Sequence, residues 1–293
     1  MSSDLYNDHF GFRERPFSLS PDPDFLFWTK AHARALSVLK YGIESRGPIT
    51  VVSGGVGTGK TTLIKELLRS INSDVTTGLI SNARGDREDL IRLVLNAYDV
   101  DAPDNLGYVP LFQRFQDFVI DEYAAGRLVA IVVDEAQNLE VETLEELRIL
   151  TNINSGKDDM LQVILVGQPE LRDMIRQSAL VQFAQRVAVT YHLEPMDLDT
   201  TIKYVKHRLT HVGGTGEEFT FEAIRHIYSE AEGIPRVINK LCDLSLVYAS
   251  SGAEKKVDVA TIKELIRDGL FMKPLPEPFL LTNRIASAGK AAE

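Results

Sequence analysis

Short apolar runs alternate with amphipathic stretches as far as residue 193. Five runs have the length and composition of buried strands: ITVVS (49–53), VTTGLI (75–80), LVAIVV (128–133), LQVILV (161–166) and VAVTYHL (187–193). Helix-like stretches lie between them, at 60–71, 86–98, 111–124, 141–153 and 169–178. Such alternation is typical of a parallel sheet with helices on its faces, so we predict an α/β domain.

The pattern changes after Leu193, where strand-like runs end. Helical patterns follow near 197–211, 220–231, 235–250 and 258–269, and the glycine-containing segments HVGGTGE and EGIPR interrupt them. Glycine at such points ends helices and permits turns. We therefore predict a small all-helical domain after the α/β domain, with the boundary near Glu194–Pro195.

The two ends of the chain have a different composition. The segment FGFRERPFSLSPDPDFLFW is rich in aromatic residues, and its three prolines prevent a continuous helix. A helix is expected from Thr29 to Ser45. The prediction has four parts: a lead-in packed on the α/β core (1–45), the α/β domain (46–194), the helical domain (195–270) and a flexible tail (271–293).

Composition excludes several classes of protein. The 293 residues are 44% hydrophobic and 25% charged, as in a globular protein. A single cysteine, Cys242, rules out an intramolecular disulfide and is expected to be a buried small side chain. The start, MSSDLYNDHF, lacks the features of a signal peptide, and no apolar run approaches the ~20 residues that span a bilayer. We expect a cytoplasmic protein, with peripheral association with the inner membrane left open.

The net charge of −10 and the pI of about 5.2 argue against a protein that spreads along a phosphate backbone. A local basic patch remains compatible with this total. Nucleic acid is therefore a disfavoured but open partner.

The stretch GGVGTGKTT lies between the first predicted strand and the helix that follows. Gly54, Gly59, Lys60 and Thr61 fit the pattern G-x-x-x-x-G-K-[ST], in which backbone N–H groups and a lysine bind phosphates and the hydroxyl binds Mg²⁺. The alternative is a glycine-rich turn with a chance lysine. The residues predicted to bind ATP are Gly54, Gly55, Val56, Gly57, Thr58, Gly59, Lys60, Thr61 and Thr62.

A second motif, AIVVDEAQ, ends the third predicted strand with two carboxylates. Asp134 is expected to hold Mg²⁺ together with Thr61, and Glu135 to orient or deprotonate the attacking water. Taken alone, the two carboxylates could simply be polar residues at the end of a strand, without a catalytic role. With the phosphate loop upstream, it predicts ATP hydrolysis.

The ordered motifs resemble those of AAA+ ATPases, and in particular the general secretion pathway protein A (ExeA-like) family. The matching stretches are FGFRERPFSLSPDPDFLFW, GGVGTGKTTL, VVDEAQNL, LEELRILTN, LQVILVGQPEL, FAQRVAVTYHLEPM and GIPRVINKLCDLSLVYA. The resemblance implies a P-loop NTPase domain followed by a helical lid, with ATP and Mg²⁺ as cofactors. It also implies self-association into an ATP-dependent oligomer.

The resemblance also implies three further catalytic residues. Gln168 matches the sensor 1 position, where the alternative is a residue that caps the next helix. Arg186 matches the arginine finger that serves a neighbouring subunit. Arg236 matches sensor 2, a lid arginine that reaches the γ-phosphate, and is therefore also expected to bind ATP. For each of them the alternative is a solvent-exposed arginine without a role in the site. The family lead-in would also allow His32 near the adenine, although a core or surface histidine is the simpler expectation.

Two functions follow. The first is a motor or switch ATPase that assists assembly or regulation of a bacterial envelope secretion or exopolysaccharide export system, with protein partners from that system. The second is a DNA-associated AAA+ regulator of the transposition type, which would need clustered Lys and Arg. The basic stretches at 206–211 and 254–256 are short. A scaffold with negligible turnover is a third interpretation, disfavoured by intact Lys60, Asp134 and Glu135.

Overall fold

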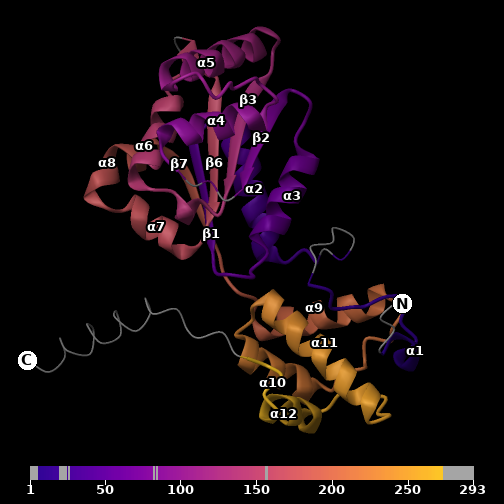
Figure 1. Ribbon diagram of the computed structural model, residues 1–293. Helices are drawn as coiled ribbons and strands as arrows, with labels where there is room; N and C mark the ends of the chain where they lie inside the picture. The colour runs from indigo at the N-terminus through magenta and orange to yellow at the C-terminus, as the bar shows by residue number, and fades with distance from the viewer. Residues whose placement is uncertain are drawn as a thin grey trace, which may run out of the picture. The chain divides into compact units, whose positions relative to one another are not determined.

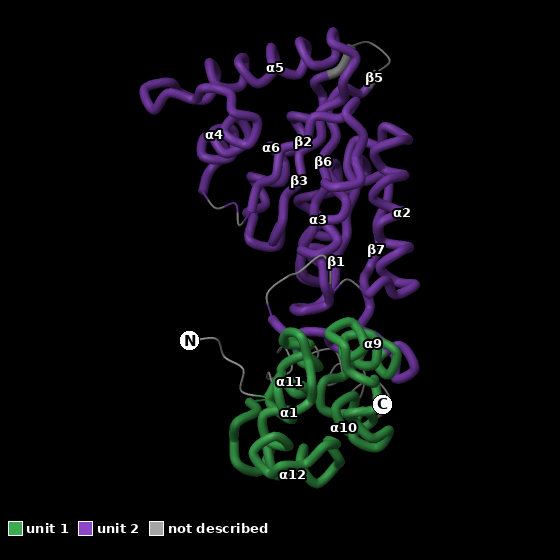
Figure 2. The backbone as a smooth tube through the Cα atoms, turned by 90° about the vertical axis from the view of Figure 1, so that its right-hand side faces the viewer, with its two compact units in different colours: residues 1–17, 201–233, 237–293 green, residues 18–200, 234–236 purple. Residues whose placement is uncertain are grey.

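The computed structural model describes residues 6–19, 25, 27–81, 83, 85–155 and 158–272. They form two compact units, shown in separate colours in Figure 2. The α/β unit comprises the described residues of 18–200 together with Ile234–Arg236, and the helical unit those of 1–17, 201–233 and 237–293. The predicted α/β fold followed by a helical region is confirmed.

Five parallel strands form the sheet of the α/β unit (Figure 1). They are β1 (Ile49–Gly54), β2 (Val75–Ser81), β3 (Leu128–Asp134), β6 (Leu161–Gly167) and β7 (Val187–Leu193). Their order in the sheet is β2-β3-β6-β1-β7. The carboxyl ends of β3, β6 and β1 therefore lie side by side, at the edge where open α/β sheets bind ligands.

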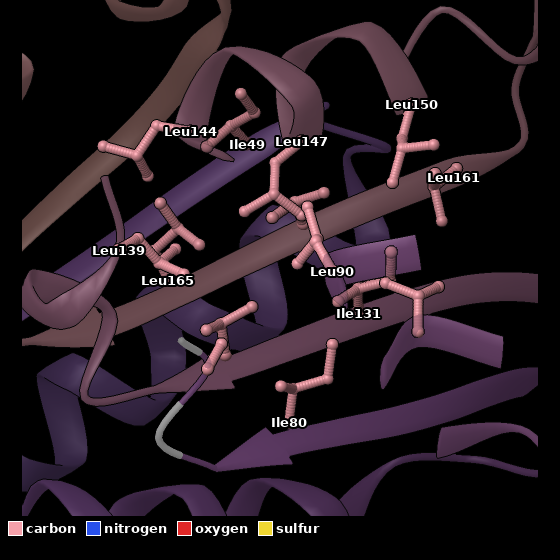
Figure 3. Close-up of a cluster of buried hydrophobic side chains, with 14 of the residues drawn as sticks. Ile49, Ile80, Leu90, Ile131, Leu139, Leu144, Leu147, Leu150, Leu161 and Leu165 are labelled. Atoms are coloured by element: carbon pink, nitrogen blue, oxygen red, sulfur yellow. The ribbon is translucent and has the colours of Figure 1, made fainter. Parts of the chain in front are cut away.

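The near-continuous apolar runs arise because most of the sheet is buried on both faces. Side chains alternate between faces along a strand. Thus Val132 and Ile164 join one cluster of buried side chains, whereas Ile131, Val133 and Leu165 join the other. Part of the second cluster is drawn in Figure 3.

Helices cover both faces, as predicted. The cluster that contains Val132 includes side chains from α2 (Lys30–Glu44) and α3 (Lys60–Ser70). The other cluster includes side chains from α4 (Arg87–Ala97), α5 (Tyr108–Ala124), α6 (Val141–Leu150), α7 (Pro169–Ile175) and α8 (Val181–Arg186). Three-residue 3₁₀ turns η2 (Ala136–Asn138) and η3 (Ser178–Leu180), and the short strands β4 (Asn154–Ser155) and β5 (Asp158–Asp159), complete this unit.

The helical unit is built from α1 (Asn7–Phe10), most of α9 (Leu198–His211), α10 (Phe221–Ala231), most of α11 (Pro235–Ser251) and α12 (Val259–Arg267). Side chains fix where α10 and α12 begin, since Thr220 accepts from Ala223 N and Asp258 accepts from Thr261 N. None of the helices in the described part of the chain has the length and apolar character that crossing a bilayer requires.

The lead-in is divided between the units, which differs from the expected packing of residues 1–45 on the α/β core. Residues 6–17 belong to the helical unit. Phe17 is fully buried with its ring edge-on to Phe219, and Arg208 Nε donates to the carbonyl of Pro16 at 2.6 Å. An aromatic-rich sequence shows that its side chains need burial, but not which apolar surface will bury them.

The boundary after the last strand also lies later than expected, between Thr200 and Thr201. The remaining parts of the predicted lead-in and tail, residues 1–5, 20–24, 26 and 273–293, lie outside the described residues.

Candidate nucleotide-binding site

The phosphate-loop motif forms the connection between β1 and α3. Gly57 and Gly59 have φ values of 80° and 100°, the left-handed region that glycine adopts without steric cost. The Thr58 hydroxyl donates to the carbonyl of Gly55 at 2.9 Å and stabilises the turn. The sequence thus folds locally into a curled loop that leads into the N-terminus of an 11-residue helix, an arrangement suited to anions.

Lys60 places a cation within this loop. Its side chain is buried, and its Nζ donates to the carbonyl oxygens of Gly54 at 2.7 Å and Gly55 at 3.0 Å. These contacts hold the ammonium at the place where phosphate oxygens would bind to the loop.

Asp134 and Thr61 bring oxygen ligands together beside the loop. The Thr61 hydroxyl donates to Asp134 Oδ2 at 3.2 Å, and the Glu135 N–H donates to Asp134 Oδ1 at 2.9 Å. Burial raises the pKa of the Asp134 carboxyl, while these hydrogen bonds and Lys60 act in the opposite direction. A hydroxyl next to a carboxylate fits Mg²⁺, which takes few protein ligands and completes its shell with phosphate and water.

Nothing in the described residues suggests a metal site built wholly from side chains, because they contain no group of three or more His, Cys, Asp or Glu that could hold an ion. A cation at Asp134 and Thr61 would therefore share its coordination with a bound phosphate.

Glu135 is held by two glutamine side chains. Its Oε2 accepts from Gln137 Nε2 at 2.6 Å and from Gln168 Nε2 at 3.3 Å. Gln137 Oε1 in turn accepts the backbone N–H of Gln168 at 2.9 Å. Glu135 itself has φ 55°, an uncommon conformation for a residue with a side chain. The carboxylate is thus oriented by groups from the ends of β3 and β6.

Gln137 was not predicted from the sequence as a site residue. The sequence signal that could have indicated it is a polar amide side chain two positions after Glu135, just after the end of a buried strand. Gln168 occupies the N-cap position of α7, yet its side chain does not cap the helix and instead reaches Glu135. The side chain of Gln168 therefore does not have the alternative role of capping α7.

Two histidines also lie beside the loop. His32 is buried, and its Nε2 lies 3.0 Å from the carbonyl oxygen of Thr58. His192, at the end of β7, has its Nδ1 2.9 Å from the hydroxyl of Ser53 at the end of β1. His32 is therefore a buried histidine, one of the roles expected for it, and it contacts the phosphate loop.

The structure places the two predicted arginines very differently. Arg236, in the first turn of α11, donates its backbone N–H to the carbonyl of Gly57 at 3.3 Å and therefore lies beside the phosphate loop. Arg186 ends α8 just before β7 and donates to Asn152 Oδ1 at 2.6 Å.

Arg186 directly precedes the amino end of β7, whereas the phosphate loop follows the carboxyl end of β1, so the two lie at opposite ends of the parallel strands. In the register of β7 with β1, Val187 lies beside Ile49 and Leu193 beside Gly54. Five residues of strand separate these levels, or about 16 Å. The fold thus does not bring Arg186 to the phosphate loop of its own chain.

A phosphate loop after β1, acidic residues at the end of β3 and this strand order are the features of a P-loop NTPase fold. Residues 43–175 match the family model described as AAA domain. The chain is similar to general secretion pathway protein A of Aeromonas hydrophila, with 36% identity over 86% of this chain and 46% of that protein. It therefore spans less than half the length of this relative.

Solved structures share the fold at low sequence identity. The Aeropyrum pernix ORC2 protein, solved as ADPNP and ADP complexes, is 16% identical with a TM-score of 0.62, over 87% of this chain and 71% of that one. The Thermotoga maritima RuvB Holliday junction branch migration motor is 14% identical with a TM-score of 0.51, over 82% and 69%. At these identities the likeness concerns the fold alone.

Proposed function

We propose that the protein is a Mg²⁺-dependent ATPase that converts ATP to ADP and phosphate. The observation that carries this proposal is the position of Glu135, a carboxylate that Gln137 and Gln168 orient and that directly follows Asp134, the partner of Thr61. A nucleotide-binding protein without hydrolysis would have no need for a carboxylate held in this way.

Each residue has a distinct role in this proposal. The loop N–H groups and Lys60 bind the β- and γ-phosphates, and Thr61 and Asp134 hold Mg²⁺. Bound Mg²⁺ neutralises the charge that develops on the phosphates. Glu135 orients the attacking water and accepts its proton. Gln168 and Arg236 are proposed to contact the γ-phosphate end of the nucleotide.

The first experiment separates binding from chemistry. Lys60→Ala should weaken ATP binding by about 100-fold, because it removes a charge-assisted phosphate contact of a few kcal/mol. Glu135→Gln should bind ATP normally and lose turnover. Lys65→Ala on the exposed side of α3 and Glu140→Gln, also exposed, are the matched controls. Normal hydrolysis by the Glu135→Gln protein would remove the basis of the proposal.

We further propose that the active form is an oligomer in which Arg186 completes the site of a neighbouring subunit. Support comes from its place at the amino ends of the strands, where it is too far from the phosphate loop of its own chain to contact a nucleotide bound there. The hydrogen bond to Asn152 would have to open or rearrange when a neighbour's nucleotide approaches.

For the cellular role, we propose a cytoplasmic motor or switch that assists assembly or regulation of an envelope secretion or polysaccharide export system through its protein partners. The support is the 36% identity to general secretion pathway protein A. A DNA-associated regulator is the competing proposal.

Three residues of the short basic stretches 206–211 and 254–256 favour the export proposal over the DNA-associated regulator. Lys206 pairs with Glu217 at 2.6 Å, Arg208 is buried, and Lys255 Nζ donates to the carbonyl of His9 at 2.5 Å. Side chains engaged in this way contribute little to a phosphate-binding surface.

A mobility shift with duplex DNA and a slow ATP analogue, across a salt series, decides between the two. We expect weak, strongly salt-dependent binding and an unchanged ATPase rate at about 150 mM salt. Sub-micromolar binding that survives this salt, together with faster hydrolysis, would favour the DNA-associated regulator.

A further inference from the structure

His32 joins the N-terminal part of the α/β unit to the phosphate loop. It lies in the first turn of α2, with 9% of its surface exposed. Its Nε2 is 3.0 Å from the Thr58 carbonyl oxygen, and its Nδ1 is 2.7 Å from the Thr29 hydroxyl oxygen. Both ring nitrogens therefore have a partner, and one partner is the backbone of the loop itself.

The partners determine which nitrogen carries the proton. A carbonyl oxygen has no hydrogen to give, so the contact with Thr58 is a hydrogen bond only if Nε2 is protonated. The Thr29 oxygen already accepts the backbone N–H of His32 at 3.1 Å and can donate its own hydrogen to Nδ1. Burial lowers the pKa of His32, which agrees with a neutral ring.

This bond determines the direction of the next peptide N–H. A trans peptide is planar, with its C=O and N–H pointing in opposite directions. Because the Thr58 carbonyl faces His32, the N–H of Gly59 points away from α2. That N–H is then free to serve as one of the donors by which a phosphate loop binds its anion.

The contact also explains why residue 59 is glycine. Its φ is 100°, and a Cβ there would lie 2.7 Å from His32 Nε2. A flexible glycine can also reverse its peptide and turn a carbonyl oxygen toward the phosphates, where it would repel them. His32 holds the peptide in the direction that attracts the anion.

We propose that His32 is a positioning residue for nucleotide binding: through its Nε2–H it fixes the Thr58–Gly59 peptide so that the Gly59 N–H faces the phosphates. Thr29 supports it by holding the ring in the required tautomer. This inference rests on the proposed nucleotide-binding function and adds a residue outside the phosphate-loop and DEAQ motifs.

The test compares two replacements of His32 in the full chain. His32→Leu fills the space without a donor, whereas His32→Gln offers an amide N–H near the position of Nε2. Because His32→Leu leaves the Thr58 carbonyl without this donor and the loop peptide is no longer held for the anion, it should raise the Kd for ATP by roughly 10-fold or more. Its kcat at saturating ATP should change by less than about 3-fold, since the chemical groups are untouched.

His32→Gln should return the Kd to within about 3-fold of the wild type. Ser37→Ala, which removes an exposed hydroxyl on the same helix, is the neutral control. If His32→Leu does not fold, Thr29→Val and Thr29→Ser provide the same comparison at the supporting residue. Equal ATP affinity in His32→Leu and wild type, or equal loss in the Leu and Gln variants, would overturn the proposal.

Amide hydrogen exchange without nucleotide separates this inference from the proposed function. His32→Leu should speed exchange in the segment 55–60, because the loop peptide is no longer held, and His32→Gln should not. If the wild type binds no ATP, the proposed function fails, while the exchange result still shows whether His32 orders the loop. Unchanged exchange in His32→Leu would contradict the inference whatever the ATP affinity.

Discussion

Replacing Gln137 with leucine tests whether the orientation of Glu135 limits hydrolysis. The change keeps a side chain of similar size but removes the donor to Glu135 Oε2 at 2.6 Å and the acceptor for the Gln168 N–H at 2.9 Å. The weaker contact from Gln168 Nε2 to this carboxylate, at 3.3 Å, would remain. Glu135 would then be free to adopt other rotamers.

The size of the effect follows from the bond that is lost. A hydrogen bond to a charged group contributes about 1.5–3 kcal/mol, and each 1.36 kcal/mol is tenfold in rate. If this energy serves to hold the carboxylate in its reactive position, kcat should fall by about 10- to 100-fold. ATP affinity should be nearly unchanged, because no phosphate contact is removed.

Steady-state hydrolysis over a range of ATP concentrations, with a separate binding titration, measures the two effects. Gln113→Leu, the same chemical change on the exposed side of α5, is the control. The reasoning is refuted if Gln137→Leu hydrolyses ATP as fast as the wild type. A faster rate would refute it in a more informative way, since Gln137 would then restrain Glu135 from reacting.

Three further results are expected. Mixing inactive Arg186→Ala and Lys60→Ala proteins should restore part of the ATPase activity, because one type of interface then has both an intact arginine and an intact loop; no recovery at any concentration would argue against a shared site. Phe17→Ala should destabilise the helical unit by about 3–5 kcal/mol, because it removes a fully buried ring, and hydrogen exchange in α10 measures this. An equal loss of protection from exchange in β3 would mean that residues 6–17 stabilise both units. Burial lowers the pKa of His32 below its ordinary value of 6.5, so near and below that pH the unfolded chain binds more protons than the folded chain does. The free energy of unfolding should therefore decrease as the pH falls, by at most about 1.4 kcal/mol per pH unit. His32→Gln should reduce this dependence in urea unfolding at pH 7.5 and 5.5, and an identical dependence in both proteins would contradict the assignment.

The strands, most helices and the phosphate loop could be predicted from the sequence because their signals are local. A buried parallel strand needs a run of apolar residues wherever it lies, and a loop that curls around an anion needs glycine at particular positions. Lys60, Thr61 and Asp134 belong to motifs of this kind, so residue type and spacing were enough to single them out.

Other features depend on contacts between residues far apart in the chain. Gln137 and Gln168 meet Glu135 because β3 and β6 are neighbours in the sheet, and the strand order is not written in any single run of residues. His32 reaches Thr58 from a helix that precedes β1, and residues 6–17 pack on the helical unit although the sequence suggested the α/β core. Local pattern specifies which residues must be buried or turned, whereas only tertiary packing decides which partner buries them and which carbonyl or carboxylate they hold.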